Sequence, residues 1–274
     1  MTSRDGALSA ILKRENWIVA SALLMLALLA WADLAWLAVR MNASMNAPMP
    51  GMASMAGMDI HAMAPVLLPW TQSHFFFMFA MWSVMMVGMM TPSASPMILI
   101  YGQVARQAHT LGRDFAPACW FAAGYLLSWT AFALAATATQ YGLERLALMT
   151  PMMAVSNSVF GAAVLIAAGL YQWTPFKESC LAQCRAPLSF VQAHGGFKPG
   201  ISGSLRLGVL HGAYCIGCCA ALMALLFVAG VMNLLWIAAL MIFVLAEKVM
   251  PGGHMLSRVA GVAAIVAGVW LLAA

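Results

Sequence analysis

The sequence predicts an all-α fold: a polytopic bundle of about seven transmembrane helices, with the N-terminus in the cytoplasm and the C-terminus outside. The chain has 274 residues, of which 64% are hydrophobic and only 8% are charged, whereas a soluble domain carries roughly a quarter charged residues. The apolar residues also form long runs, which the polar surface of a soluble protein would interrupt. Basic residues, finally, gather on one side when each run is taken to cross the membrane.

Seven apolar runs approach the roughly 20 residues that a helix needs to cross the hydrocarbon core. In chain order they are 17–39, 75–100, 116–139, 153–173, 207–230, 233–250 and 256–273. The last two are short, and a thin boundary at Met232 and Asn233 separates 233–250 from the run before it, so a count of six stays open. The first run is too long for the core of a signal peptide and no small-residue cleavage site follows it, so we expect a retained helix.

The distribution of Lys and Arg sets the predicted orientation, because these residues are enriched on the cytoplasmic side. With the N-terminus inside, the cytoplasmic segments hold Arg4, Lys13, Arg14, Arg106, Arg113, Lys177, Arg185, Lys198, Arg206, Lys248 and Arg258. The outside holds only Arg40 and Arg145. The net charge of +5 is therefore a topology signal. It does not indicate nucleic-acid binding, since no basic stretch is interleaved with aromatic residues.

These spans divide the chain into three predicted parts. Residues 1–39 are the N-terminal tail and the first helix, and residues 40–74 are a flexible, Met-rich extracytoplasmic loop. Residues 75–274 are a six-helix membrane domain that contains a cytoplasmic loop at 174–206. The first half of that loop favours a short amphipathic helix at the membrane surface.

Methionine is the most unusual feature of the composition, with 24 residues. In the outer loop it recurs every three to five positions, with a histidine among the methionines: Met41, Met45, Met49, Met52, Met55, Met58, His61 and Met63. Thioethers are soft ligands, and they suit an oxidising compartment because they form no disulfides. We interpret the segment as a metal-capture loop. A low-complexity spacer is the alternative.

The helix predicted at 75–100 carries a second group of methionines. Met78, Met81, Met85 and Met89 lie three or four residues apart, which places them on one helical face, and Met86 and Met90 lie beside that face. Thioether sulfur selects Cu(I) among the common biological metals. The alternative is that these residues fill gaps in a helix interface, which is the commoner reason for a stripe of methionine taken alone.

The helix predicted at 207–230 carries the more specific pattern. His211, Cys215 and Cys219 are each four residues apart, Cys218 adds a C-x-x-C, and Met223 extends the same face. Donors at this spacing point to one region of space. The alternative is that the cysteines pack as small hydrophobic residues, but a neutral histidine in hydrocarbon still needs a partner.

The two groups are predicted at matching depth. Met85 lies about 15 Å from the outer end of its helix and Cys215 about 13 Å from the inner end of its own, near the middle of a ~30 Å core. If these helices touch, Met85, Met89, Cys215, Cys218 and Cys219 would line one soft-metal site. The sequence leaves open whether the donors form one site or two.

Cys180 and Cys184 form a further pair in the cytoplasmic loop, again four residues apart. In a reducing cytoplasm they are expected to be thiols, and Lys177 and Arg185 favour their thiolate forms. They could exchange Cu(I), bind Zn or have no metal role. The chain thus places methionine outside, methionine and cysteine in the membrane, and cysteine inside, which is the order that Cu(I) handling across a membrane needs.

Glu247 and Lys248 end the helix predicted at 233–250. An interfacial ion pair with a lysine that reaches toward water is the favoured interpretation. The alternative is a proton acceptor or a charge that balances a bound cation.

Three segments together resemble a known family. They are MWSVMMVGMMTPSASPMI at 81–98, KESCLAQCRAPLSF at 177–190, and HGAYCIGCCAALMALLFVAGVMNLLWIAAL at 211–240, which Glu247 and Lys248 follow. Over roughly residues 75–270 the chain is similar to a bacterial family of predicted metal-binding integral membrane proteins, which contain a domain of unknown function. The resemblance implies metal-related roles for Met85, Met86, Met89, Met90, Cys180, Cys184, Cys215, Cys218, Cys219 and Glu247. It specifies no metal.

The function expected from the sequence is binding of a soft metal, Cu(I) first and Zn second, by a multi-pass protein of the bacterial inner membrane. The protein would transport the ion or deliver it to a metallochaperone or a membrane partner. A membrane metalloenzyme or redox protein and a structural subunit of a membrane complex are the alternatives. The chain contains no P-loop, G-x-S-x-G or H-E-x-x-H motif, so an energy-coupled pump that acts alone is not expected. An enzyme is the less favoured interpretation because the sequence shows no signature of a substrate pocket.

Overall fold

A computed structural model of the protein describes residues 3–46, 70–110, 116–150, 153–197 and 199–273. Within these residues the fold is all-α, as predicted, and an isolated bridge between Met149 and Val155 is the sole β-type pairing. The helices are α1 (Ser3–Asn46), α2 (Gln72–Thr110), α3 (Ala118–Arg145), α4 (Ser158–Tyr171), α5 (Pro175–Arg185), α6 (Pro187–Ala193), α7 (Gly200–Ala229), α8 (Leu234–Val249) and α9 (Gly253–Ala273).

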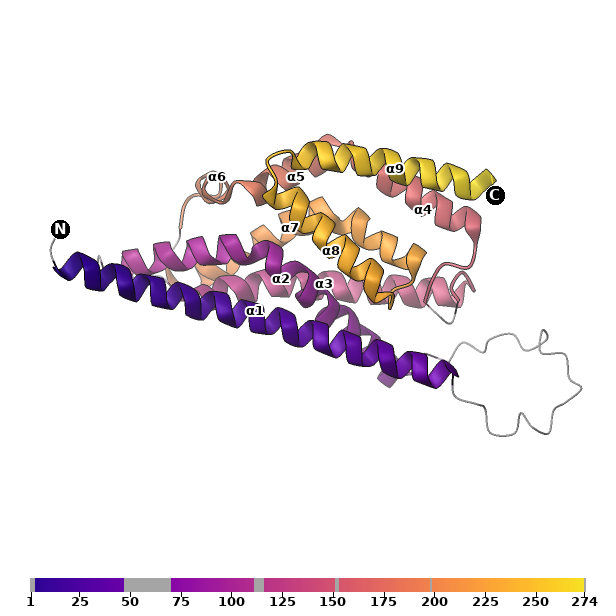
Figure 1. Cartoon of the computed structure of the whole chain (residues 1–274), viewed down its shortest axis with the longest axis horizontal. Helices are drawn as coiled ribbons and strands as arrows, with labels where there is room; N and C mark the ends of the chain where they lie inside the picture. Colours follow the sequence, from indigo (N-terminus) through magenta and orange to yellow (C-terminus); the bar gives the residue numbers. More distant parts are fainter. Residues whose placement is uncertain (1–2, 47–69, 111–115, 151–152, 198, 274) are drawn as a thin grey trace, which may run out of the picture.

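The long helices run along one common axis and alternate in direction (Figure 1). The first described residues of α1 and the end of α9 lie at opposite ends of the molecule. The short helices α5 and α6 lie toward the end at which α1 begins. Leu24, Leu28, Val266 and Trp270 are among the large apolar side chains exposed on the outside of the bundle, as expected for a surface that faces lipid.

Five described segments are long and apolar enough to cross a membrane: Trp17–Arg40, Gln72–Ala108, Ala118–Arg145, Gly200–Ala229 and Gly253–Ala273. A sixth span results if α4 and α5, which meet at a bend of 63°, are counted as one broken span. α8 has 16 residues, fewer than the roughly 20 that a full crossing usually needs. Seven spans and the predicted orientation therefore stay predictions.

Glycine allows two helix pairs to pack backbone against backbone. A Cβ atom on Gly208 of α7 would collide with the carbonyl oxygen of Phe121 on α3, and one on Gly124 of α3 would collide with the carbonyl oxygen of Leu205. α4 and α9 approach in the same way at Gly169. Close approach through small residues is the usual way in which membrane helices associate. It holds α7, which carries three of the six cysteines, firmly against α3.

The segment predicted as the cytoplasmic loop contains two helices, and the first of them is not confined to the surface. Thr174 caps α5 by accepting a hydrogen bond from the Lys177 backbone N–H at 3.3 Å, and Pro175 begins the helix, a position that suits its fixed φ. α5 packs against α7 and α8, and Cys180 is buried. The short helix was predicted, whereas its docking into the bundle was not.

Candidate metal centre

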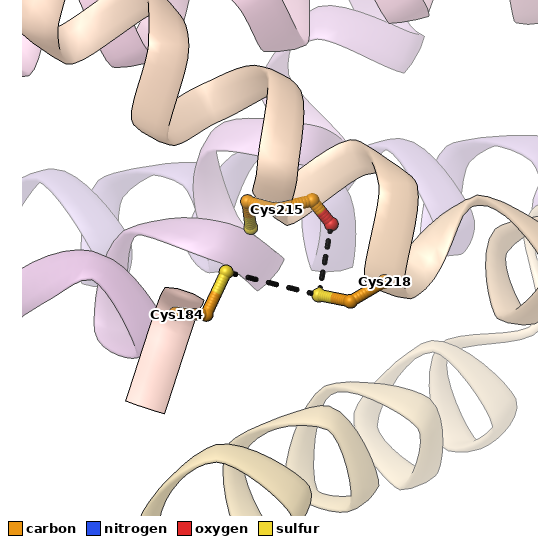
Figure 2. Close-up of side chains that lie close together, drawn as sticks. All are labelled: Cys184, Cys215 and Cys218. Carbon is orange, nitrogen blue, oxygen red and sulfur yellow. Dashed lines mark hydrogen bonds between the residues drawn. The ribbon is translucent and has the colours of Figure 1, made fainter. Parts of the chain in front are cut away.

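Three cysteines from two helices form a cluster, which we call the thiol cluster: Cys184, Cys215 and Cys218. Their Sγ atoms all lie within 4.8 Å of one another, and those of Cys184 and Cys218 are 3.9 Å apart. Figure 2 shows the three side chains converging, with Cys184 at the end of α5 and the other two about one turn apart on α7. This arrangement could hold a metal ion.

The packing of α5 against α7 explains why Cys184 reaches this position. A Cβ atom on Gly217 would lie 2.7 Å from the Cys180 Sγ atom, so only glycine leaves room for α5 here. The Tyr171 hydroxyl, one turn before α5, donates a hydrogen bond to the Gly217 carbonyl oxygen. Cys180 thus occupies the packing interface, while Cys184 lies one turn further on, at the thiol cluster.

Cys219 adjoins the thiol cluster without belonging to it. Its Sγ atom is 3.3 Å from that of Cys218, and the Cys218 thiol also lies 3.1 Å from the Cys215 carbonyl oxygen. Four of the predicted cysteines therefore gather in one place: Cys184 from α5, and Cys215, Cys218 and Cys219 from α7. Cys119, on α3, is exposed.

Lys248 of α8 contacts the thiol cluster directly. Its ammonium group donates to Cys215 Sγ and to Ser93 Oγ, each at 2.9 Å. The Tyr125 hydroxyl lies 3.1 Å from the same sulfur and donates to the Met90 carbonyl oxygen at 3.2 Å. Lys248 and Tyr125 therefore connect α2 to Cys215, and a cation and a phenol both contact this sulfur.

Glu247 turns the other way and forms a buried ion pair. Lys177 Nζ of α5 lies 2.8 Å from Glu247 Oε1, and both side chains are 1% exposed. Ser257 of α9 donates to the same carboxylate oxygen at 2.5 Å, and Lys177 also donates to Gln172 Oε1. The favoured sequence interpretation, an interfacial pair at the end of one helix, missed this arrangement. The carboxylate instead ties α5 to α8 and α9.

The four methionines predicted on α2 are all fully buried: Met85, Met86, Met89 and Met90. We call them the thioether row. Met223, on α7, is buried as well. The connection from Met90 through Tyr125 to Cys215 is made by the backbone carbonyl of Met90. A single site shared by thioether and thiol sulfur stays a prediction.

His211 is buried among aromatic side chains and is not a member of the thiol cluster. Its ring centroid is 5.1 Å from that of Phe190, 5.8 Å from that of Tyr125 and 5.9 Å from that of Phe121. Its Nδ1 atom has no hydrogen-bond partner within the described part of the chain. The predicted role of this histidine as a ligand therefore stays a prediction.

The predicted metal-capture loop cannot be compared with the structure. Met49, Met52, Met55, Met58, His61 and Met63 lie outside the described residues. The backbone of Met41 and Met45 belongs to α1, but their side chains also lie outside what the structure describes.

Sequence reasoning missed Tyr125 and Ser93 beside the cluster, and it associated Lys177 with the thiols of Cys180 and Cys184, whereas the structure pairs this lysine with Glu247. Tyr125 and Ser93 carry no spacing signal, since each is a single polar residue in an apolar run. Lys177 had one usable signal. It lies three residues before Cys180, so in a helix both side chains lie on the same side. This spacing could have predicted that the helix packs into the bundle through the side that carries Lys177.

These features define a helical protein with several membrane-spanning candidates and a cluster of three thiols, two of them buried, that could hold a metal ion. Residues 79–271 match the PpoB2 family, described as copper chaperone, and the chain belongs to this family. No curated protein and no solved structure shows significant similarity to the chain. The matched segment contains the thioether row, the thiol cluster, Glu247 and Lys248. The description of the family associates it with copper.

Proposed function

We propose that the protein binds Cu(I) within the bilayer at the thiol cluster and transports it or delivers it to a partner. One observation carries this proposal: three Sγ atoms, supplied by α5 and α7, lie within 4.8 Å of one another, with Cys215 and Cys218 buried and Cys184 partly buried. Sulfur atoms at such separations can all bind one ion with little rearrangement. The membership of the chain in a copper chaperone family supports copper as the cargo.

The chemistry of the donors favours Cu(I) over Zn. Thiolate and thioether sulfur are soft ligands that select Cu(I), whereas structural Zn sites are nearly always four-coordinate. Zn stays a second candidate, because Cys219 next to Cys218 supplies a fourth sulfur. The buried position also limits access of water and oxidants, which would otherwise attack a Cu(I)–thiolate centre.

The thioether row and the outer loop supply an approach path in this proposal. The loop methionines with His61 would capture the ion, and Met85, Met86, Met89 and Met90 would hold it on its way to the cysteines. His211, Met223 and Cys219 would serve as further donors beside the cluster, and Cys180 and Cys184 as the thiols nearest the cytoplasm. Burial of the whole row inside the bundle supports this path, since side chains that only anchored a helix in lipid would face outward.

The two charged residues at the end of α8 have different proposed roles. Lys248 would balance the negative charge of a copper–thiolate centre, because its ammonium group already touches Cys215. Glu247 is occupied by Lys177 and Ser257, which supports a role in docking α5 over one as a copper ligand or proton acceptor.

We place the protein in the bacterial inner membrane as a multi-pass protein with a cytoplasmic N-terminus. The apolar helices and the excess of basic residues at one end support this location. Delivery would then involve a metallochaperone or a membrane protein as the recipient.

Metal analysis of purified protein tests the proposal. Protein made in copper-replete medium and purified under reducing, anaerobic conditions should carry about one copper per chain at a single soft-donor site. The double variant Cys215→Ser/Cys218→Ser should lose it, while Cys119→Ser, which removes an exposed thiol on α3, should keep it. Copper-free wild-type protein would contradict the proposal.

The same preparation separates the two alternatives. A metalloenzyme or redox protein should show copper that cycles between oxidation states with an accompanying absorption change. A structural subunit should contain no copper in either the wild type or the cysteine variant.

A further inference from the structure

Within the described part of the chain two lysines are buried, and their surroundings differ in one decisive way. Lys177 is paired with the carboxylate of Glu247 at 2.8 Å. Lys248, 9% exposed, has Ser93 Oγ and Cys215 Sγ as its hydrogen-bond partners within the described residues. A buried ammonium needs a partner that can carry negative charge, and of these two atoms the sulfur is the one that can. The thiol cluster is therefore built together with a fixed cation.

We propose that Lys248 makes the thiol cluster selective for a monovalent ion. This inference rests on the proposed function, since it assumes that the cluster binds metal. Lysine carries three donors and no acceptor lone pair when charged, so it occupies one side of Cys215 without offering a metal ligand. An incoming ion must share that sulfur with a cation whose Nζ atom lies 2.9 Å from it.

Coulomb repulsion between Lys248 and the metal grows with the charge of the metal. A divalent ion at the cluster meets twice the repulsion that Cu(I) meets at the same position. If removal of the lysine charge raises the affinity for a monovalent ion by a factor f, it should therefore raise the affinity for a divalent ion by the square of f. The effect persists because the site is buried, where solvent screens charges weakly.

The neighbouring groups prevent the lysine from simply moving away. Ser93 holds the ammonium from α2 at 2.9 Å, and the Tyr125 hydroxyl lies 3.1 Å from the Cys215 sulfur. Glu247, the adjacent carboxylate in sequence, is engaged by Lys177 and Ser257. The acidic side chain next to Lys248 in the sequence is thus already paired with a different cation.

The test compares Cu(I) with Co(II), a spectroscopic stand-in for Zn(II), in anaerobic competition titrations. Lys248→Ala should raise the ratio of Co(II) affinity to Cu(I) affinity on the order of 10-fold, since the charge-dependent repulsion is lost. Lys248→Arg, which keeps the charge, should leave the ratio near that of the wild type. Arg258→Ala, which removes an exposed cation from α9, is the matched control and should also leave it unchanged.

The ratio is the useful quantity because a loosened or partly misfolded cluster weakens both metals together. If Lys248→Ala does not fold, Lys248→Leu removes the same charge while it retains more of the side-chain volume. The same affinity ratio is then measured in this variant. An unchanged ratio in the charge-removing variant would overturn the inference, as would wild-type protein that binds Co(II) as tightly as Cu(I). Wild-type protein that binds no Cu(I) at all would instead overturn the proposed function itself.

Discussion

The thioether row of α2 and the thiol cluster between α5 and α7 are built in different ways. The row lies on one helix, and its four methionines are buried together because helical spacing places them on adjacent positions. The cluster exists only because α5 docks beside α7 and brings Cys184 to Cys215 and Cys218. A row can tolerate shifts of its neighbours, whereas the cluster depends on tertiary contacts that are distant from the donors themselves.

The largest effect should therefore come from the ion pair that docks α5, and not from a donor. Lys177→Leu leaves Glu247 buried without its cation, which should cost about 3–5 kcal/mol of stability. Copper binding should fall with it, because Cys184 loses its position. Unfolding of the purified protein in mixed micelles measures the loss. The double variant Lys177→Leu/Glu247→Leu should recover most of it, and failure to recover would show that the pair does not dock the helix.

Replacing Cys218 should have the next largest effect. Its sulfur lies between those of Cys184 and Cys219, at 3.9 Å and 3.3 Å, so Cys218→Ser removes the most central donor. Since changes to groups around a metal ligand already cost about 10–100-fold in affinity, loss of the ligand should cost at least about 100-fold. Competition with a Cu(I) chelator measures it. Retention of wild-type affinity would exclude the thiol cluster as the copper site.

The two cysteines of α5 offer a sharper comparison. Cys184 belongs to the thiol cluster, whereas Cys180 packs against Gly217. Cys184→Ser should weaken Cu(I) binding by about 10-fold or more, less than Cys218→Ser, because the central sulfur of Cys218 and its neighbours Cys215 and Cys219 remain to hold the ion. Cys180→Ser should leave affinity near the wild-type value. Equal losses in the two variants would indicate that both residues act through the packing of α5, and that Cys184 is no ligand.

The smallest equilibrium effect should come from the thioether row. Met85→Leu/Met89→Leu keeps the core volume, so it should cost less than about 1.5 kcal/mol of stability for each change. Copper held at the cysteines at equilibrium should not change, whereas loading from outside in reconstituted vesicles should slow. A large loss of bound copper would instead show that thioether and thiol sulfur form one shared site.

Much of the architecture was predictable because hydrophobic runs and helical spacing are local properties. The run at 256–273 corresponds to α9, Gly253–Ala273, and the run at 233–250 to α8, Leu234–Val249. Cys215 and Cys218 were singled out because their spacing lies within one helix. The partner Cys184 was noted as part of a separate pair, since nothing in a sequence states which two helices will touch.

The partners of Glu247 and Lys248 could not be predicted for the same reason, since the sequence does not state which helices will touch. Glu247 and Lys248 are adjacent in sequence, which suggested a pair with each other. In the folded chain their side chains diverge, one to Lys177 and the other to Cys215, because neighbouring residues on a helix point about 100° apart. Assigning partners to buried charges requires the packing of α5, α7 and α8, which spacing rules do not provide.

X-ray absorption at the copper edge of the Cu(I)-loaded protein tests the central claim most directly. The thiol cluster predicts a first shell made of about three sulfur atoms, which disappears in the triple variant Cys184→Ser/Cys215→Ser/Cys218→Ser and persists in Met85→Leu/Met89→Leu. A shell of nitrogen or oxygen atoms, or a sulfur shell that survives in the triple cysteine variant, would contradict the account.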